Sequence, residues 1–309
     1  NENPENNRLA HEMGIIFGTS HCDMLLRSNQ NEWVPWLLQK GYDPKTVKYD
    51  YSIPGRNREI LLEYWQESIQ MNAEYEASYT VGMRGIHDSG FETKDIENSN
   101  LSKEEKMLKK KELLEEIITA QRQLLKDNLQ QNPEDILQTF VPYKEVLQYY
   151  DQGLKIPEDI TIIWANDNYG YVRRFPSEKD QLRKGGHGLY YHSSYWAATN
   201  MHYLFISSTP LARMKNELKK SWDNGIQKLW VLNVGALKPI EQDMEFFLRY
   251  AFEVGKENTT KDVVDFLSNW IDENFTGSIG EICGPLLNDF CQITNVRKIE
   301  QLDPDTFSQ

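Results

Sequence analysis

Carboxylate, amide and aromatic side chains follow directly on five short apolar segments of the chain. They are residues 20–23 after segment 13–19, Arg84 to Asp88 after 77–83, Asn166 to Tyr169 after 160–164, His192 at the end of 188–192, and Asn233 near the end of 228–234. Carboxylates and amides pair with sugar hydroxyls, and aromatic faces stack on sugar rings. The residue types therefore favour a site for a hydroxyl-rich ligand. Hydrolysis of a glycosidic bond is a chemistry that two carboxyl groups can carry out.

Most of these residues also have a simpler structural explanation. An Asn or Asp directly after a strand is usually a helix N-cap or a turn former, and Asp167-Asn168-Tyr169-Gly170 has the pattern of a turn. A single histidine such as His21 or His192 is more often a structural residue. The argument for a site is that all of them follow segments of one kind, which a parallel barrel brings to one rim.

Other catalytic chemistries lack their motifs in this sequence. There is no Gly-x-Ser-x-Gly, no His-Glu-x-x-His and no phosphate-binding loop, which disfavours acyl transfer, zinc proteolysis and nucleotide hydrolysis. The cysteines Cys22, Cys283 and Cys291 show no Cys-x-x-Cys spacing, so neither a zinc site nor a disulfide framework is predicted. A Cys283–Cys291 bridge stays open. We expect no metal ion and no cofactor.

The elements that must position these side chains alternate along the chain. Nearly continuous apolar segments are typical of strands buried on both faces of a sheet, and they occur at 13–19, 77–83, 160–164, 188–192, 202–206 and 228–234. Helical periodicity occurs between them, at 58–71, 133–150, 211–222 and 241–254. Ser102 and Glu105 predict a capping box at the start of a long charged helix over 102–131. This alternation predicts a parallel sheet with right-handed crossovers.

The predicted fold is an α/β protein of the parallel (β/α)8 TIM-barrel type. A closed barrel needs eight strands and the pattern shows six, so we expect about two strands upstream of Asn1. A doubly wound open sheet is the competing architecture, but no glycine-rich phosphate loop follows any strand. We expect residues 1–255 to form the barrel domain, N-terminally incomplete, and the helical pattern of 256–309 to begin a helical domain.

Composition narrows the class of partner. With 39% hydrophobic and 26% charged residues the chain has ordinary globular composition, and no apolar segment is long enough to span a membrane. The net charge of −13 argues against a nucleic-acid partner, and an anionic sugar would need a local basic group. The first residues lack the pattern of a signal peptide, so the protein is either cytosolic or its sequence begins downstream of a targeting segment.

Several long motifs resemble one family of enzymes. The motifs are GIIFGTSH at 14–21, TVGMRG at 80–85, the segment 141–174, GGHGLYYHSSYW at 185–196 and LWVLNVGALKPIEQDMEFFL at 229–248. In this order they are similar to the barrel domain of glycoside hydrolase family 115, whose members are α-glucuronidases that remove glucuronic acid or its 4-O-methyl form from xylan with inversion. The resemblance covers at least residues 9–255. It implies an N-terminal domain and two barrel strands before the start of this chain.

The resemblance also implies roles for individual residues. Glu145, in the Tyr-Lys-Glu-Val motif, matches a catalytic carboxyl that we expect to be the general acid, and Asp88 matches the expected general base. Arg84 would pair with the substrate carboxylate. The other expected substrate-binding residues are His21, Asn166, Asp167, Asn168, Tyr169, His192 and Asn233. An inverting pair is expected to lie about 6.5–9.5 Å apart and to face one cleft, with Glu145 partly buried among Tyr143 and Tyr149.

The implied partner is a xylan-derived oligosaccharide that carries glucuronate, with no nucleic acid and no membrane. For the full-length protein, a homodimer is a possible form, and an extracellular or periplasmic location is expected. Two departures from the family pattern stand out. Asn166 occupies a position that is usually aspartate, and Cys22-Asp23-Met24 replaces the usual His-Glu-Pro. A catalytically weak or inactive sugar-binding relative with the same cleft is therefore the alternative hypothesis.

Overall fold

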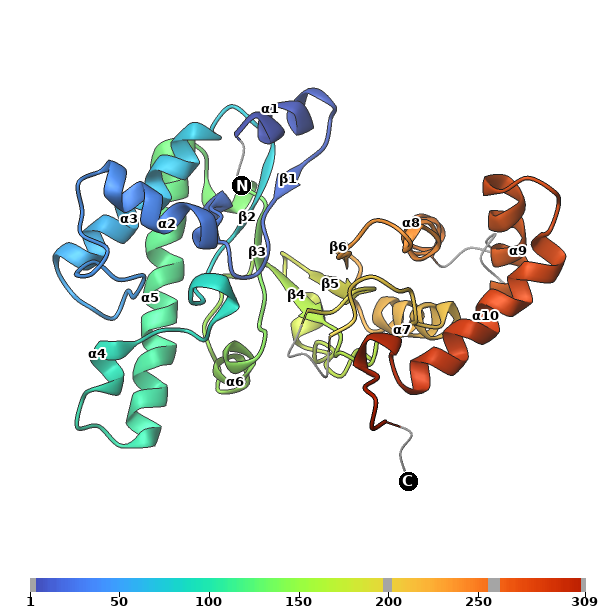
Figure 1. The fold of residues 1–309 in the computed structure, drawn as a ribbon. Helices are drawn as coiled ribbons and strands as arrows, with labels where there is room; N and C mark the ends of the chain where they lie inside the picture. Colours follow the sequence, from blue (N-terminus) through green and yellow to red (C-terminus); the bar gives the residue numbers. More distant parts are fainter. Residues whose placement is uncertain (1–3, 197–201, 255–261, 307–309) are drawn as a thin grey trace. The chain divides into compact units, whose positions relative to one another are not determined.

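The computed structural model describes residues 4–196, 202–254 and 262–306, which form an α/β protein with parallel strands (Figure 1). The strands pair in chain order from β1 to β6, and every pair with a defined register is parallel. Their bounds are β1 Phe17–Gly18, β2 Ala77–Thr80, β3 Gln138–Phe140, β4 Thr161–Ala165, β5 His187–His192 and β6 Leu229–Asn233. The prediction of an α/β fold built on parallel strands is confirmed.

The chain forms two compact units. The first contains residues 1–162 and 183–185, and the second contains residues 163–182 and 186–309. Strand β4 passes from one unit to the other, because Thr161 and Ile162 pair with β3 while the residues that follow belong to the second unit.

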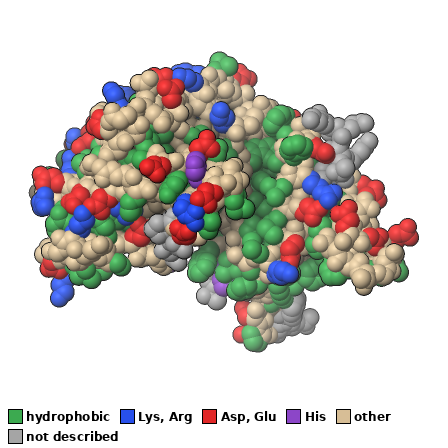
Figure 2. Space-filling view, turned by 90° about the horizontal axis from the view of Figure 1, so that it is seen from above, with side chains coloured by type: hydrophobic (Ala, Val, Ile, Leu, Met, Phe, Trp, Pro, Cys, Tyr) green, Lys and Arg blue, Asp and Glu red, His purple; other side chains and the backbone are tan. Residues whose placement is uncertain are grey.

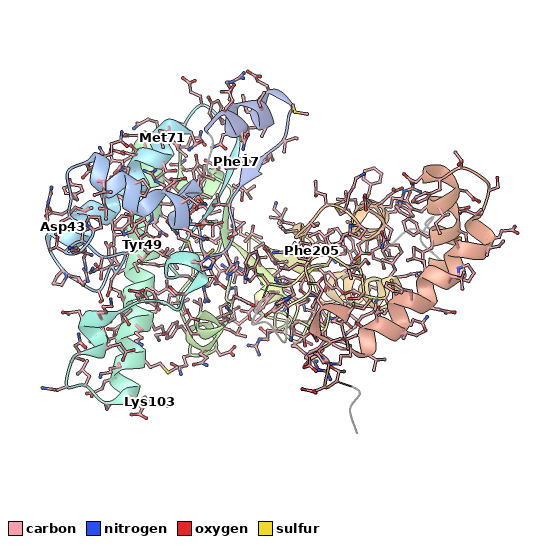
Figure 3. All side chains as sticks on the ribbon, in the orientation of Figure 1. Phe17, Asp43, Tyr49, Met71, Lys103 and Phe205 are labelled. Atoms are coloured by element: carbon pink, nitrogen blue, oxygen red, sulfur yellow. The ribbon has the colours of Figure 1, made fainter. Side chains whose placement is uncertain are left out.

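Helices and aromatic side chains form the core of the first unit. The helices are α1 Pro4–Glu12, α2 Asn29–Gln39, α3 Arg56–Met71, α4 Lys94–Glu97, α5 Lys103–Leu129 and α6 Glu145–Asp151, with short 3-10 turns at η1 Met24–Leu26, η2 Ile86–Asp88 and η3 Pro133–Asp135. Tyr49, labelled in Figure 3, is buried and packs edge-on against Trp33, with ring centroids 5.3 Å apart. Both rings also contact Tyr64 of α3. Packing of this kind fixes α2 and α3 side by side.

The long helix α5 is both a surface helix and a support for the loop after β2. It begins with the predicted capping box, in which Ser102 Oγ accepts from the Glu105 amide at 3.2 Å and the Glu105 carboxylate accepts from the Ser102 amide at 2.8 Å. Basic and acidic side chains are interspersed over the face of this unit seen in Figure 2. On its buried side, the Gln121 amide bonds both the N–H and the C=O of Gly82, each at 2.8 Å. This pair of bonds fixes the backbone just before Arg84.

The second unit combines β5 and β6 with a set of helices. Its helices are α7 Leu211–Asp223, α8 Glu241–Glu253, α9 Val263–Asn274 and α10 Gly280–Val296, and its 3-10 turns are η4 Asp180–Leu182 and η5 Ile299–Gln301. All five β6 residues pair in register with β5, from Gly188 with Leu229 to His192 with Asn233. Gly188 is required here, because a Cβ at this position would lie 2.5 Å from Ile163 Cδ1 and from the Leu229 carbonyl. Helices α9 and α10 pack against each other as an antiparallel pair.

Two predicted elements are wrong. The expected strand at 202–206 contributes only an isolated bridge between Tyr195 and Tyr203. The expected helix at 133–150 consists of η3, strand β3 and the short helix α6. Pro142 explains part of this error, because the residue before a proline is pushed out of the helical region and a helix cannot run through it. The predictions at 58–71, 211–222, 241–254 and 102–131 are confirmed as α3, α7, α8 and α5.

The three cysteines are free, so the Cys283–Cys291 bridge is not formed. Both residues belong to helix α10, where eight residues correspond to a rise of about 12 Å. Disulfide geometry requires Cα atoms within about 7 Å. None of the described helices is long and apolar enough to cross a membrane. The expected boundary at residue 255 lies outside the described residues.

Candidate active site

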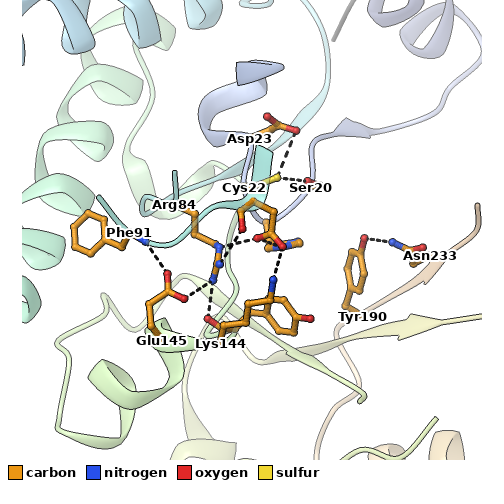
Figure 4. A network of polar contacts seen from close by, with 12 residues as sticks. Ser20, Cys22, Asp23, Arg84, Phe91, Lys144, Glu145, Tyr190 and Asn233 are labelled. Carbon is orange, nitrogen blue, oxygen red and sulfur yellow. Dashed lines mark hydrogen bonds and ion pairs between the residues drawn. The ribbon is translucent and has the colours of Figure 1, made fainter. Parts of the chain in front are cut away.

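A cluster of charged side chains lies in the loops that follow β1, β2 and β3 of the first unit (Figure 4). Asp88 is at its centre. Its Oδ1 lies 3.0 Å from His21 Nε2 and 2.8 Å from Arg84 Nε, and its Oδ2 lies 2.8 Å from Lys144 Nζ. Three loops that are far apart in sequence therefore meet on one carboxylate. This convergence is what parallel strands produce at their carboxyl ends.

Arg84 joins Asp88 to the second expected catalytic residue. Its Nη1 lies 3.2 Å from Glu145 Oε2 and donates to the Tyr143 carbonyl at 3.0 Å. Nε is paired with Asp88 by charge only, since its N–H bond does not point at the carboxylate. Asp88 and Glu145 therefore pair with two nitrogens of one guanidinium group, which holds the two carboxyl groups near each other.

The place of Arg84 differs from the role expected for it. Its side chain is only 2% exposed, and it is engaged by two carboxylates and by the backbone carbonyls of Tyr143 and Asp88. Lys144, by contrast, is 48% exposed and sits over the ring of Tyr143 at 5.3 Å. A buried guanidinium of this kind serves to hold Asp88 and Glu145, whereas Lys144 presents its charge to solvent.

Glu145 is the first residue of α6, where a carboxylate interacts favourably with the helix dipole. Its Oε1 accepts a hydrogen bond from the Phe91 amide at 2.8 Å, and its Oε2 pairs with Arg84. Tyr149 is buried nearby, and burial together with the charge of Glu145 raises its pKa to about 12. Glu145 thus has a buried tyrosine nearby, one hydrogen-bond donor, the Phe91 amide, and one ion-pair partner, the Arg84 guanidinium.

Backbone strain is concentrated in the loops that carry this cluster. Leu25, Leu26, His87, Asp88 and Lys144 have positive φ values between 51° and 65°, and they follow β1, β2 and β3. Such conformations cost roughly 1–3 kcal/mol each in a non-glycine residue and persist only where surrounding contacts impose them.

The turn that carries Asp88 depends on the glycine before it. A Cβ on Gly85 would lie 2.6 Å from the Gly90 carbonyl and would also meet Ser89. The glycine therefore lets the chain close tightly, with its amide donating to the Ser89 carbonyl at 3.0 Å.

The electrostatics of the cluster keep Asp88 ionised. Partial burial acts to raise its pKa, but hydrogen bonds from His21 and Lys144, with the positive charges of His21 and Arg84, outweigh burial and hold the pKa of Asp88 well below its usual range. A general base must be ionised to accept a proton, so this environment suits the role expected for Asp88.

Cys22 and Asp23 are structural in this arrangement. The Asp23 carboxylate accepts from the Asn29 amide at 2.9 Å at the start of α2, and burial raises the pKa of Asp23. Burial and the charge of Asp23 raise the pKa of the Cys22 thiol to about 11. A thiol in that environment stays protonated at neutral pH and is a poor nucleophile. Cys22 and Asp23, which depart from the family pattern, therefore belong to the structure of the loop next to His21.

The second unit contains its own polar cluster after β4, β5 and β6. Asn166 is 2% exposed, and its Oδ1 accepts from the backbone amide of His192 at 2.9 Å and from His192 Nδ1 at 2.6 Å. Since an amide oxygen only accepts, Nδ1 of His192 carries a hydrogen. The Asn166 Nδ2 donor has no acceptor among the described residues. Asn233 Nδ2 donates to the Tyr190 hydroxyl at 2.6 Å (Figure 4).

Asp167 has the structural role that its turn sequence indicates. Its Oδ1 accepts from the amides of Tyr169 and Tyr171, both at 2.9 Å, and its Oδ2 lies 2.6 Å from Arg173 Nε. All of these contacts fix the loop after β4. Asn168 in the same loop is half-buried, and Tyr169 is exposed.

The structure thus brings the predicted residues His21, Arg84, Asp88 and Glu145 together in the first unit. In the second unit it pairs Asn166 with His192. Sequence reasoning missed Lys144, Tyr190 and Gln121. Lys144 precedes Glu145 in the Tyr-Lys-Glu-Val motif, and Tyr190 is two residues before His192 on the same face of β5, which is a detectable signal. Nothing in the sequence pairs Gln121 with Gly82. Among the described residues, no group of three or more His, Cys, Asp or Glu is arranged to hold a metal ion.

Replacing Arg84 with methionine should lower the free energy of unfolding by about 2–4 kcal/mol, because two carboxylates lose the cation that they share. Urea unfolding of the purified variant measures this loss. Arg56→Met is the control, since Arg56 and its partner Glu59 are both exposed and 3.0 Å apart, and the loss of this pair should cost under about 1 kcal/mol. Equal losses for the two variants would contradict the central place given to Arg84.

Comparisons with known proteins place the chain among carbohydrate-active enzymes. The model of glycosyl hydrolase family 115 matches residues 1–301. A solved structure described as a novel family GH115 4-O-methyl-α-glucuronidase with specificity for decorated arabinogalactans is 32% identical, with a TM-score of 0.76. That similarity covers 94% of this chain and 35% of the other, so the chain spans about a third of that relative. Among curated proteins there is no significant match.

Proposed function

The chain belongs to glycosyl hydrolase family 115, and on that basis we propose that the complete protein removes α-linked glucuronic acid, or its 4-O-methyl form, from a polysaccharide by an inverting acid–base reaction. The observation that carries the proposal is the pair of carboxyls, Asp88 and Glu145, held on the single guanidinium of Arg84. They come from loops after two neighbouring parallel strands. Most glycoside hydrolases use two carboxyl groups that flank one glycosidic bond.

In the proposed reaction, Glu145 donates a proton to the glycosidic oxygen as its bond to the anomeric carbon breaks. Asp88 accepts a proton from a water molecule, and the oxygen of that water bonds to the same carbon from the opposite face. The proton taken up by Asp88 balances the proton given by Glu145. Both oxygens of Asp88 are engaged by cations, so one of these contacts must yield to the water. Lys144 is the most exposed of the three partners and is the one that we propose moves.

We assign the uronate carboxylate to Lys144. An anionic sugar approaching a chain with a net charge of −13 needs a local cation, and Lys144 is the accessible one in the cluster. When Lys144 pairs with the substrate, Asp88 loses one partner and its Oδ2 becomes available to water.

Lys144→Met should weaken binding of a uronate-bearing oligosaccharide by about 1.5–3 kcal/mol, or roughly 10- to 150-fold. Binding of the same oligosaccharide with the uronate reduced to glucose should change little, because that sugar has no carboxylate. Isothermal titration calorimetry measures both. Lys109→Met, which removes an exposed lysine paired with Glu112, is the control. Similar losses for the charged and the neutral ligand would exclude Lys144 from this role.

Sugar hydroxyls are proposed as ligands of the second-unit cluster. Asn166, Asn168, His192 and Asn233 supply amide and imidazole groups of the kind that bind hydroxyls, while Tyr169 offers an exposed ring in the loop after β4. In the first unit, His21 is proposed as a further substrate-binding residue beside Asp88. Asn166 makes the contacts to His192 that an aspartate could make, but without its charge. The departure at this position therefore preserves geometry and leaves Asp88 and Glu145 in place. For this reason we favour an active enzyme over an inactive sugar-binding relative.

The polysaccharide that carries the uronic acid has two candidates. The sequence motifs resemble xylan-acting members, so we propose xylan-derived oligosaccharides as the substrate. The similar solved structure is described as specific for decorated arabinogalactans, which makes these the second candidate. We also propose that the parallel strands belong to a (β/α)8 barrel domain over residues 1–255, followed by a helical domain over 256–309.

The deciding experiment uses the full-length protein with both kinds of oligosaccharide. Proton NMR of a fresh reaction should show the β-anomer of glucuronic acid appearing first, with the α-anomer formed later by mutarotation, as inversion requires. First appearance of the α-anomer would show a retaining reaction. Binding without any release of uronic acid would support the inactive sugar-binding alternative.

A further inference from the structure

We infer that Lys298 and Glu300, from the segment after α10, are positioning residues that hold the 203–209 loop and through it the aromatic support of His192. The inference rests on the proposed function in one respect, because it takes His192 as a substrate-binding residue. All of the contacts that carry it lie within the second unit. The residues concerned are far from His192 in sequence and no motif marks them.

Glu300 is bonded to three consecutive backbone amides of this loop. Its Oε1 accepts from Leu204 at 2.8 Å, from Phe205 at 2.7 Å and from Ile206 at 3.2 Å, and its Oε2 also accepts from Leu204 at 2.8 Å. The side chain is 12% exposed. Phe205, labelled in Figure 3, is itself exposed, so the carboxylate holds the backbone while that side chain points away. Bonds from amides to a carboxylate are among the stronger hydrogen bonds in proteins.

Lys298 holds the next part of the loop. It is 4% exposed, and its Nζ donates to the Ser208 carbonyl at 3.0 Å and to Thr209 Oγ1 at 3.2 Å. The same Nζ lies 4.4 Å from the centre of the Tyr203 ring, a cation–π contact. Burying a lysine is costly unless its donors are satisfied. Here two of its donors are directed to this loop, and a third goes to Asn295 at 3.3 Å.

Each of the six residues 204–209 is therefore hydrogen-bonded to a side chain from outside the loop. Glu300 holds residues 204–206, Lys298 holds Ser208 and Thr209, and Ser207 Oγ donates to the buried Asp243 of α8 at 2.7 Å. Side chains from the segment after α10 and from α8 thus replace the strand pairing that this segment lacks. A loop held in this way has a defined conformation although it is not part of the sheet.

From the loop the contacts lead to His192. Tyr203 and Tyr195 exchange backbone hydrogen bonds at 2.7 and 2.9 Å, and their rings stack with centroids 6.0 Å apart. The Tyr195 ring then packs edge-on against His192, with centroids 5.0 Å apart. The same imidazole is also fixed by the hydrogen bond from its Nδ1 to Asn166 Oδ1. The Tyr190 ring packs edge-on against the same imidazole, also with centroids 5.0 Å apart. Release of the loop should therefore loosen one of these three contacts that orient His192.

The test compares three variants of the full-length protein. Glu300→Ala removes both acceptor oxygens. Glu300→Gln keeps one carbonyl oxygen, and in the wild type Oε1 alone accepts three of the four hydrogen bonds from the loop. Asp303→Asn is the matched control, because Asp303 is exposed and, within the part of the chain that the structure describes, its hydrogen bonds stay within 303–306. Hydrogen exchange of the amides of residues 204–206 and of Tyr195 is measured, together with kcat and KM on a glucuronate-bearing oligosaccharide.

Glu300→Ala should raise exchange at 204–206 and at Tyr195 at least 10-fold, and raise KM about 3- to 10-fold with kcat within about 2-fold. Glu300→Gln should recover most of both effects, and Asp303→Asn should change neither. Fast exchange at 204–206 with Tyr195 unchanged, or a fall in kcat with KM unchanged, would overturn the inference. If wild-type protein releases no uronic acid, the proposed function fails, and exchange at Tyr195 still decides whether the loop supports the His192 side.

Discussion

Glu145→Gln should lower kcat on a natural glucuronate-bearing oligosaccharide by about 10²- to 10⁴-fold, the contribution expected of a general acid. The substitution keeps the shape of the side chain and an oxygen for the Phe91 amide, so its binding contacts are largely preserved. The loss should depend on the leaving group. With an aryl glucuronide whose phenol leaves without protonation, the same variant should retain activity within about 10-fold of wild type.

Steady-state kinetics on the two substrates measures this difference. Glu134→Gln is the control, since Glu134 is exposed and pairs with Lys184 away from the cluster. An equal loss on both substrates would remove Glu145 from the role of acid. It would leave this residue as a structural partner of Arg84.

Asp88→Asn should lower kcat by a similar factor of about 10²- to 10⁴-fold, but on both substrates. Activation of water is needed whichever group leaves, so an activated phenol should not rescue this variant. Measuring both variants on both substrates therefore distinguishes the general base from the general acid. Rescue of Asp88→Asn by the aryl glucuronide would reverse the two assignments.

The same variant has a signature in the pH dependence of stability. Because the pKa of Asp88 is lowered in the folded protein, its ionised form stabilises the fold fully above its unfolded pKa of about 4. This stabilisation is lost as pH falls through the lower folded-state pKa. Unfolding free energies should therefore differ between wild type and Asp88→Asn by a constant amount above about pH 5, and the difference should begin to shrink below about pH 4 and continue to shrink toward the folded-state pKa. Asp223→Asn, at an exposed helix position, is the control variant measured over the same pH range.

Much of the fold could be predicted from the sequence because its determinants are local. Apolar segments of the right length predicted β2, β4, β5 and β6, and helical periodicity predicted α3, α7 and α8. The capping box at Ser102 needs only two residues three positions apart, so it too was visible. The parallel order of the strands follows from their alternation with helices.

The errors occur where the local signal is weak. Strand β3 is three residues long and includes the buried polar residues Gln138 and Thr139, so no apolar segment marks it. The segment 202–206 has the apolar residues of a strand, but its backbone is bonded to Glu300 and not to a neighbouring strand. A carboxylate nearly one hundred residues away is not part of any local pattern.

The sequence and the family resemblance named most residues of the candidate site, but they did not predict the role of each residue within it. Arg84 and Asp88 follow a strand that the sequence predicted, whereas β3, which precedes Glu145, was not predicted, so only the family resemblance pointed to Glu145. In the structure these residues follow neighbouring parallel strands, whose carboxyl ends lie at one edge of the sheet. Which cation is buried and which is exposed depends on packing. Gln121 of α5 fixes the backbone at Gly82 and the tight turn at Gly85 directs Arg84 inward, leaving Lys144 in solvent. Whether a side chain is buried depends on its contacts with elements that are distant in the sequence, and only the tertiary structure shows those contacts.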